Sequence, residues 1–141
     1  MRHFGYPSTL PLFLELLESE SSLFEKTLSE IESKLLTPYG LASLSPDDPL
    51  FGSEEDYWRG AIWININFLG LKALKRYGVQ SSAANSLYLE LRQRLIQTLT
   101  SEWTRTRYVW EQYDAGTGRG RRNHPFTGWS SLIALIISEK L

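Results

Sequence analysis

Apolar residues recur at three- and four-residue intervals in successive segments, and this spacing constrains the fold more than any other feature. Leu87, Leu91, Leu95 and Leu99 stand four residues apart, a spacing that places them on one face of a helix. Residues 22–36 show the same periodicity, with Glu and Lys between the apolar positions, as in an amphipathic helix. We therefore expect an all-α protein.

Five helices separated by two long loops account for the whole chain. The expected helices span residues 7–18, 22–36, 57–77, 81–103 and 127–140. The third is apolar on every side, which indicates a buried helix, and Gly78 stands where it would end. The loops, at 38–56 and 108–125, are rich in Pro and Gly and have a length that usually serves a function.

The length of 141 residues fits a single domain, so we treat residues 1–141 as one segment. An aromatic fraction of 13%, with 5 Trp, exceeds what packing needs and hints at a binding surface. The sequence has no Cys, which excludes disulfides, thiolate metal sites and cysteine nucleophiles. The longest apolar run, 132–137, is far shorter than the roughly 18 residues of a membrane span. We expect no membrane segment and no targeting signal.

The net charge of −1 hides an asymmetry between the two halves of the chain. Residues 1–56 carry 3 basic and 11 acidic side chains, whereas residues 57–141 carry 12 basic and 5 acidic ones. A basic half can indicate nucleic-acid binding. We instead expect the two halves to complement each other, without a nucleic-acid partner, and we expect Arg119, Arg121 and Arg122 to form a solvated loop edge.

Common catalytic and cofactor motifs are not recognisable. The glycines at 116, 118 and 120 lack the Gly-Lys-Ser/Thr ending of a phosphate-binding loop. His3 and His124 are far apart and belong to no cluster with metal-ligand spacing. We therefore expect neither a metal nor a cofactor.

Three strings carry a resemblance to a known family, and three shorter segments support it. The strings are 57–67 (YWRGAIWININ), 110–114 (WEQYD) and 124–129 (HPFTGW), and the shorter segments are 5–6, 10–12 and 38–45. In this order they resemble the C-terminal part of the catalytic domain of glycoside hydrolase family 63. Eukaryotic members of that family are the mannosyl-oligosaccharide glucosidases, or processing α-glucosidases I. The resemblance runs over nearly the whole chain.

The resemblance implies an (α/α)6 barrel of twelve helices that removes terminal α-linked glucose from N-linked oligosaccharides with inversion. In eukaryotes it also implies the endoplasmic reticulum. Twelve helices of about 11 residues each, with their connections, need on the order of 200 residues. The five expected helices would therefore form a partial barrel.

By the same resemblance, Glu111 matches the position of the family's general base. An inverting glycosidase also needs a general acid, which lies upstream in the family, and nothing in residues 1–56 matches its surroundings. We therefore expect the chain alone to be inactive. From spacing alone, Glu111 could instead be an ordinary loop carboxylate paired with Arg107 or Arg119.

Aromatic and polar side chains near these strings are candidates for substrate binding. The candidates are Trp110, Tyr113, Trp58, Arg59, Trp63 and Asn65. Aromatic residues at helical spacing usually pack in the core, and a buried Arg59 would usually pair with an acidic loop residue. Asn65 and Asn67 stand two apart on the expected helix, so at most one of them faces a site.

The sequence thus predicts the C-terminal segment of an inverting α-glucosidase that acts on glucosylated N-linked oligosaccharides. The alternative is a non-catalytic remnant that acts as a glycan-binding or protein-interaction module. In either case an open flank of the partial barrel could support self-association or docking on a longer relative.

Overall fold

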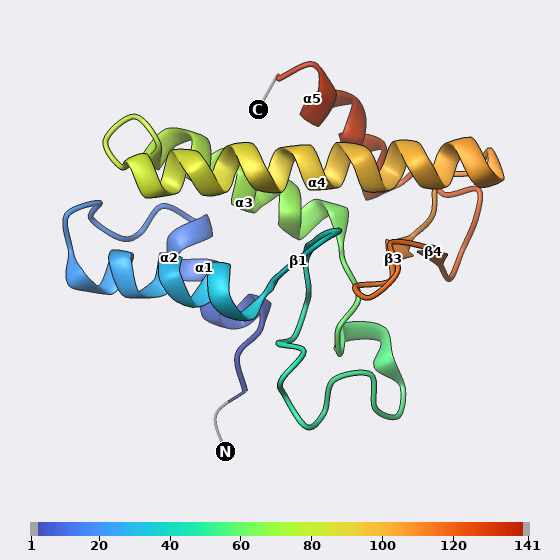
Figure 1. Cartoon of the computed structure of the whole chain (residues 1–141), viewed down its shortest axis with the longest axis horizontal. Helices are drawn as coiled ribbons and strands as arrows, with labels where there is room; N and C mark the ends of the chain where they lie inside the picture. The colour runs from blue at the N-terminus through green and yellow to red at the C-terminus, as the bar shows by residue number, and fades with distance from the viewer. Residues whose placement is uncertain (1–2, 140–141) are drawn as a thin grey trace.

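The chain is described by a computed structural model that covers residues 3–139 and is mostly helical (Figure 1). The α-helices are α1 (Tyr6–Phe13), α2 (Ser22–Lys34), α3 (Ile64–Tyr77), α4 (Ser82–Thr106) and α5 (Ile133–Ile137). Short 3₁₀-helices, η1 (Asp56–Trp58) and η2 (Trp129–Leu132), precede α3 and α5. Two antiparallel hairpins pair β1 (Leu36–Thr37) with β2 (Gly40–Leu41) and β3 (Gln112–Tyr113) with β4 (Gly120–Arg121). The all-α prediction is confirmed, with two small hairpins added.

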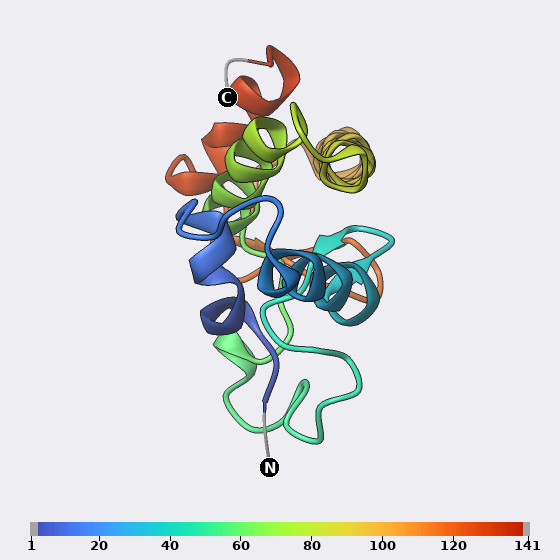
Figure 2. The same cartoon turned by 90° about the vertical axis from the view of Figure 1, so that its left-hand side faces the viewer.

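Helices α3 and α4 form the centre of the molecule. Figure 2 looks along the axis of α4 and shows α3 beside it. Helices α1 and α2 both lie below α4 in this view. Every fourth residue of the leucine stripe 87–99 is buried on α4. Ser81 caps this helix, because its hydroxyl accepts a hydrogen bond from the Ala84 amide at 3.2 Å. The helical periodicity therefore predicted both the existence of α4 and its buried face.

Helix α1 is shorter than expected and ends at Phe13 rather than near residue 18. Glu15 has a left-handed backbone with φ of 59°. Its amide donates to the Leu12 carbonyl, and the Leu16 amide donates to the Pro11 carbonyl, each at 2.9 Å. These two bonds form a Schellman motif, which satisfies the last carbonyls of the helix and ends it. The predicted continuation over 14–18 is wrong.

The expected helix over 57–77 begins only at Ile64. Gly60 has φ of 134°, and a Cβ at this position would meet the Phe51 ring at 2.7 Å. Such a backbone interrupts a right-handed helix. Residues 61–63 are extended instead, and Ile62 forms bridges with Ala42 on one side and Tyr113 on the other. Trp58 therefore ends the short η1 and Arg59 follows it, and their placement on a buried helix is wrong.

Both long loops are present, and each contains a hairpin. The first begins with the β1–β2 turn, where the Leu41 amide and carbonyl face α3. The second folds back through β3 and β4, and the Gly120 amide donates to Glu102 of α4 at 3.0 Å. The expected helix over 127–140 is η2 followed by the short α5. Its last expected residue, Lys140, lies outside the described residues.

A buried hydrogen-bond network around Asn67 and Tyr6 joins α1, β2 and α3. The Asn67 Oδ1 accepts from the Leu41 amide at 2.8 Å, and its Nδ2 donates to the Leu41 carbonyl at 3.1 Å. The Tyr6 hydroxyl donates to the same carbonyl at 2.7 Å and accepts from the Trp63 amide at 3.2 Å. Asn67 Nδ2 also donates to the Tyr6 hydroxyl at 3.0 Å. Both side chains are buried, so water cannot replace these bonds.

Within residues 3–139, no helix combines the length and the apolar character that crossing a bilayer would require.

Replacing Asn67 should therefore destabilise the fold. Asn67→Ala leaves the Leu41 amide and the Tyr6 hydroxyl short of a partner inside the core, which we expect to lower the free energy of unfolding by about 3 kcal/mol. Urea denaturation followed by circular dichroism measures this loss. Asn85→Ala, at an exposed position of α4, is the control and should change stability by less than about 0.5 kcal/mol. A loss below about 1 kcal/mol for Asn67→Ala would contradict the role of the network.

Candidate active site

The extended segment 61–63 determines where the base candidate lies. The Ile62 amide donates to the Tyr113 carbonyl at 2.8 Å, and the Tyr113 amide donates to the Ile62 carbonyl at 3.0 Å. This pair of bonds fixes β3 against the start of α3. Glu111 precedes Tyr113 by two residues and is therefore held next to residues 57–63, which lie about 50 positions earlier in the chain.

The side chain of Glu111 is 4% exposed, and three donors bind its carboxylate. The Tyr57 hydroxyl donates to Oε1. Asn123 donates to Oε2 twice, from Nδ2 at 2.5 Å and from its backbone amide at 3.3 Å. The expected alternative, a pair with Arg107 or Arg119, is wrong.

The backbone on either side of the carboxylate is held as firmly. Trp129 Nε1 donates to the Glu111 carbonyl at 2.7 Å, and the Ser130 hydroxyl donates to the Trp110 carbonyl at 2.6 Å. The Glu111 amide donates to the Asn123 carbonyl at 3.0 Å. Glu111 therefore has a fixed position in the folded chain.

These contacts favour the ionised form of Glu111. Burial raises the pKa of the carboxyl group. The hydrogen bonds from Tyr57 and Asn123 and the nearby charge of Arg122 together lower it by more, so the pKa of Glu111 lies below the ordinary value. The same hydrogen bond to Glu111 raises the pKa of Tyr57. The proton therefore stays on the phenol and the charge on the carboxylate.

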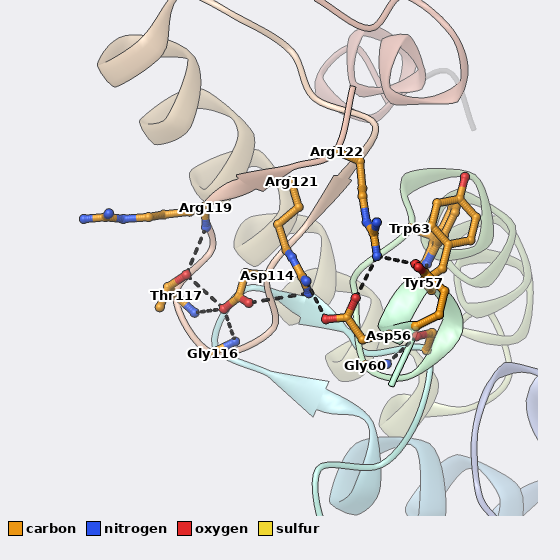
Figure 3. A network of polar contacts seen from close by, with 12 residues as sticks. Asp56, Tyr57, Gly60, Trp63, Asp114, Gly116, Thr117, Arg119, Arg121 and Arg122 are labelled. Carbon is orange, nitrogen blue, oxygen red and sulfur yellow. Dashed lines mark hydrogen bonds and ion pairs between the residues drawn. The ribbon is translucent and has the colours of Figure 1, made fainter. Parts of the chain in front are cut away.

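Charged residues from the two halves of the chain form a network (Figure 3). One of them, Arg122, lies close enough to Glu111 to act on its charge. Asp56 accepts from Arg121 and, at 2.8 Å, from Arg122. Arg122 also pairs with Glu55 at 2.5 Å. Arg119 and Arg122 are exposed, as expected for a solvated edge, whereas Arg121 is partly buried. Arg121 and Arg122 also bind acidic residues of the other loop, which was not expected. These pairs bear out the expected complementarity of the two halves.

Asp114 shapes the turn between β3 and β4. Its Oδ1 accepts from the amides of Gly116 and Thr117 at 3.0 and 2.9 Å, and from the Thr117 hydroxyl at 2.9 Å (Figure 3). Side chains of Asp commonly close turns in this way. The glycine-rich segment is thus a hairpin turn, held by its own aspartate.

The tryptophans take different positions around Glu111. Trp63 is buried, and Trp58, which is 51% exposed, stacks on it with ring centroids 3.9 Å apart and an angle of 10°. Trp110 packs against the His124 ring at 3.8 Å on one side and against Gly120 on the other, where a Cβ would overlap the indole. The exposed face of Trp58 is the one open to a ligand. Substrate contact by any of the three stays a prediction.

The remaining candidates are placed as follows. Arg59 pairs with Glu54 at 2.7 Å, which is the structural ion pair considered as its alternative. Tyr113 is buried, and its hydroxyl accepts from the Trp110 amide at 3.2 Å; burial raises its pKa to about 12. The Oδ1 atom of Asn65 is buried and has no hydrogen-bond partner among the described residues. A substrate role for these three also stays a prediction.

Tyr57 and Asn123 contact the base candidate, although sequence reasoning did not select either of them. Tyr57 opens the first of the three strings, and Asn123 immediately precedes the third. Their places at the edges of these strings were the available signal. The part of the chain that is described contains no group of three or more His, Asp or Glu residues able to hold a metal ion.

The Asp56 network should make stability depend on pH. The hydrogen bond from Arg121, followed by that from Arg122, holds the pKa of Asp56 below its usual value despite partial burial. A lowered native pKa contributes stability above the unfolded value of about 4, and this contribution is lost as the pH falls through the native pKa. Asp56→Asn removes it at every pH. Calorimetry should show a difference in Tm between wild type and variant that is largest at about pH 6–7 and shrinks below about pH 4.

The control for this series is Asp47→Asn, at an exposed residue of the same loop. Its melting curve should follow the wild type at every pH. Parallel curves of Tm against pH for Asp56→Asn and wild type would show that the ion pairs do not titrate as the geometry requires.

Comparison with known proteins follows the same strings of residues. The sequence model of the glycosyl hydrolase family 63 C-terminal domain matches residues 1–139. A probable mannosyl-oligosaccharide glucosidase of Schizosaccharomyces pombe is 44% identical over 144 residues, which cover 97% of this chain and 18% of that protein. The mannosyl-oligosaccharide glucosidase of Saccharomyces cerevisiae is 37% identical, with 97% and 18% covered. The chain thus spans about a fifth of the length of these relatives.

A solved structure shows the same arrangement within a larger body. The GH63 mannosylglycerate hydrolase from Thermus thermophilus, in complex with Tris and D-glycerate, aligns with a TM-score of 0.72 and 28% identity. The alignment covers 96% of this chain and 30% of that one. This coverage agrees with the expectation of a partial barrel. With the family model matched over nearly its whole length, the chain belongs to glycosyl hydrolase family 63.

Proposed function

We propose that this chain supplies the general-base side of the active site of an inverting α-glucosidase, with Glu111 as the base. The observation that carries the proposal is the buried, ionised Glu111 carboxylate, fixed by Tyr57 and Asn123. A base that accepts a proton from water must be ionised and correctly placed before the substrate arrives. The two fungal relatives described above bear the name of glucosidases, which supports the same reaction.

In this reaction a water oxygen bonds to the anomeric carbon while its proton passes to Glu111. The glycosidic bond breaks, and the leaving oxygen takes a proton from a second carboxyl group on the opposite face of the sugar. That group must be protonated beforehand. Asp56 lies nearby but is held ionised by Arg121 and Arg122, so it is unsuited to donate the proton. The family resemblance implies that the general acid belongs to another part of the catalytic domain, and we expect the chain alone to be inactive.

The proposed substrate is the terminal α-linked glucose of an N-linked oligosaccharide, and the proposed place of action is the endoplasmic reticulum. Identity favours this substrate over mannosylglycerate, since the glucosidase of S. pombe is 44% identical and a mannosylglycerate hydrolase of T. thermophilus is 34% identical. Trp58 lines the apolar hollow described next, so its exposed ring is not assigned to the sugar. The alternative, a non-catalytic binding or interaction module, gains no specific support from the site.

An apolar hollow marks the flank on which the rest of the catalytic domain would pack. The hollow has a volume of about 410 Å³, and its lining includes Tyr6, Leu10, Leu44, Leu50, Trp58 and Ile66. Three of these side chains, Leu10, Leu50 and Trp58, are exposed. An exposed apolar surface of this kind usually marks a site where a partner binds. The solved relative is about three times as long as the matched segment, so it has further chain that could cover this surface. We therefore assign the hollow to the remainder of the domain, or to a second copy when that remainder is missing.

Activity should depend on Glu111 once the catalytic domain is complete. A swap protein that carries this chain in place of the matched segment of the S. pombe glucosidase tests this on a glucosylated N-linked oligosaccharide. The wild-type swap should be active, Glu111→Gln should lower kcat by about 10² to 10⁴-fold, and Glu32→Gln on the exposed face of α2 should leave it unchanged. The isolated chain should show no turnover. Hydrolysis by the isolated chain, or full activity of Glu111→Gln, would refute the assignment.

The isolated chain should associate through the hollow. Light scattering at increasing concentration should detect dimers or larger species, because the exposed apolar side chains are uncovered. Leu50→Glu places a charge on this surface and should weaken association at least about tenfold. Val79→Glu, at an 85% exposed position between α3 and α4, is the matched control and should have no effect. A stable wild-type monomer would argue against an open flank.

A further inference from the structure

The three donors around Glu111 do not occupy its two oxygen atoms equally. An ionised carboxylate offers about four acceptor positions, two on each oxygen. Asn123 uses both positions on Oε2, through Nδ2 and its backbone amide. Among residues 3–139, Oε1 accepts from Tyr57 alone. One acceptor position therefore remains, and it lies on Oε1 beside the Tyr57 hydroxyl.

The ring of Tyr57 is itself fixed on several sides. Trp63 contacts it edge-on, with centroids 4.6 Å apart and an angle of 82°, and Trp63 Nε1 donates to the Tyr57 carbonyl at 3.2 Å. The Arg122 guanidinium lies 5.5 Å from the ring centroid, and Arg122 is anchored in turn by Asp56. Tyr57 thus needs little reordering to hold its hydroxyl on Oε1, which is the condition for an efficient positioning group.

We infer that Tyr57 is a positioning residue for the general base: its hydroxyl orients Glu111 and leaves one position on Oε1 for the attacking water. The inference rests on the proposed function, because it assumes that Glu111 is the base that binds the attacking water. Tyr57 exchanges no proton in the reaction. The water proton passes to Oε1, and the phenol donates to that oxygen before the transfer. The direction of the pKa shifts of Glu111 and Tyr57 agrees with this division of roles.

Tyr57→Phe tests the role of the hydroxyl, because it removes one oxygen atom and keeps the ring against Trp63. In the isolated chain, the ¹³C NMR signal of the Glu111 carboxyl group should titrate with a midpoint about one pH unit higher than in wild type, since one hydrogen bond to the charged form is lost. Tyr108→Phe is the matched control at an exposed tyrosine and should leave the midpoint unchanged. An unshifted midpoint in Tyr57→Phe overturns the positioning role.

The swap protein provides the kinetic readout. Tyr57→Phe should lower kcat about tenfold, leave KM within about twofold, and move the acid limb of the pH profile upward by about one unit. A purely structural role would lower activity without moving that limb, and this result overturns the inference. If the NMR midpoint shifts but an intact wild-type swap is inactive, the proposed function fails while the hydrogen bond stands. If the wild-type swap needs Glu111 but is indifferent to Tyr57→Phe, only the positioning role fails.

Discussion

The buried network of Asn67 and Tyr6 is the constraint on which the rest of the structure depends. It fixes the backbone of Leu41 on one side and of Trp63 on the other, so the extended residues between Gly60 and α3 have one available path. That path brings Ile62 against Tyr113 and thereby sets the position of Glu111. An amide that lies far from the carboxylate in the chain thus determines where the carboxylate can be.

Ion pairs then join the two long loops next to this hydrogen-bond network. The acidic residues 55 and 56 end the first half of the chain, and Arg121 and Arg122 belong to the basic second half. The Asp56 carboxylate is partly buried and binds both arginines, so its pairs resist screening better than the pair of Arg59 with the exposed Glu54. The charge asymmetry of the sequence is therefore used locally, to hold Tyr57 and β4 near each other.

Sequence reasoning recovered what is local in the chain. Helical spacing predicted α2 and α4 with their buried faces, and the family strings indicated Glu111. It failed at Gly60, where a left-handed backbone and an extended segment replaced the expected first turns of α3. It also failed to select Tyr57, which lies 54 positions from Glu111. Periodicity carries no information on contacts at such separations, since these depend on how the loops fold together.

The hydrogen bonds from Trp129 and Ser130 to the carbonyls of residues 111 and 110 come from a part of the chain that is synthesised later. On the ribosome, Glu111 leaves the exit tunnel before either of these partners has emerged. Strand β3, which follows Glu111, can pair with Ile62 as soon as it has emerged. The carbonyls of residues 110 and 111 gain their partners, the Ser130 hydroxyl and the Trp129 indole, only later. The surroundings of Glu111 are thus assembled only when residues 129 and 130 have been translated and have folded back onto this segment.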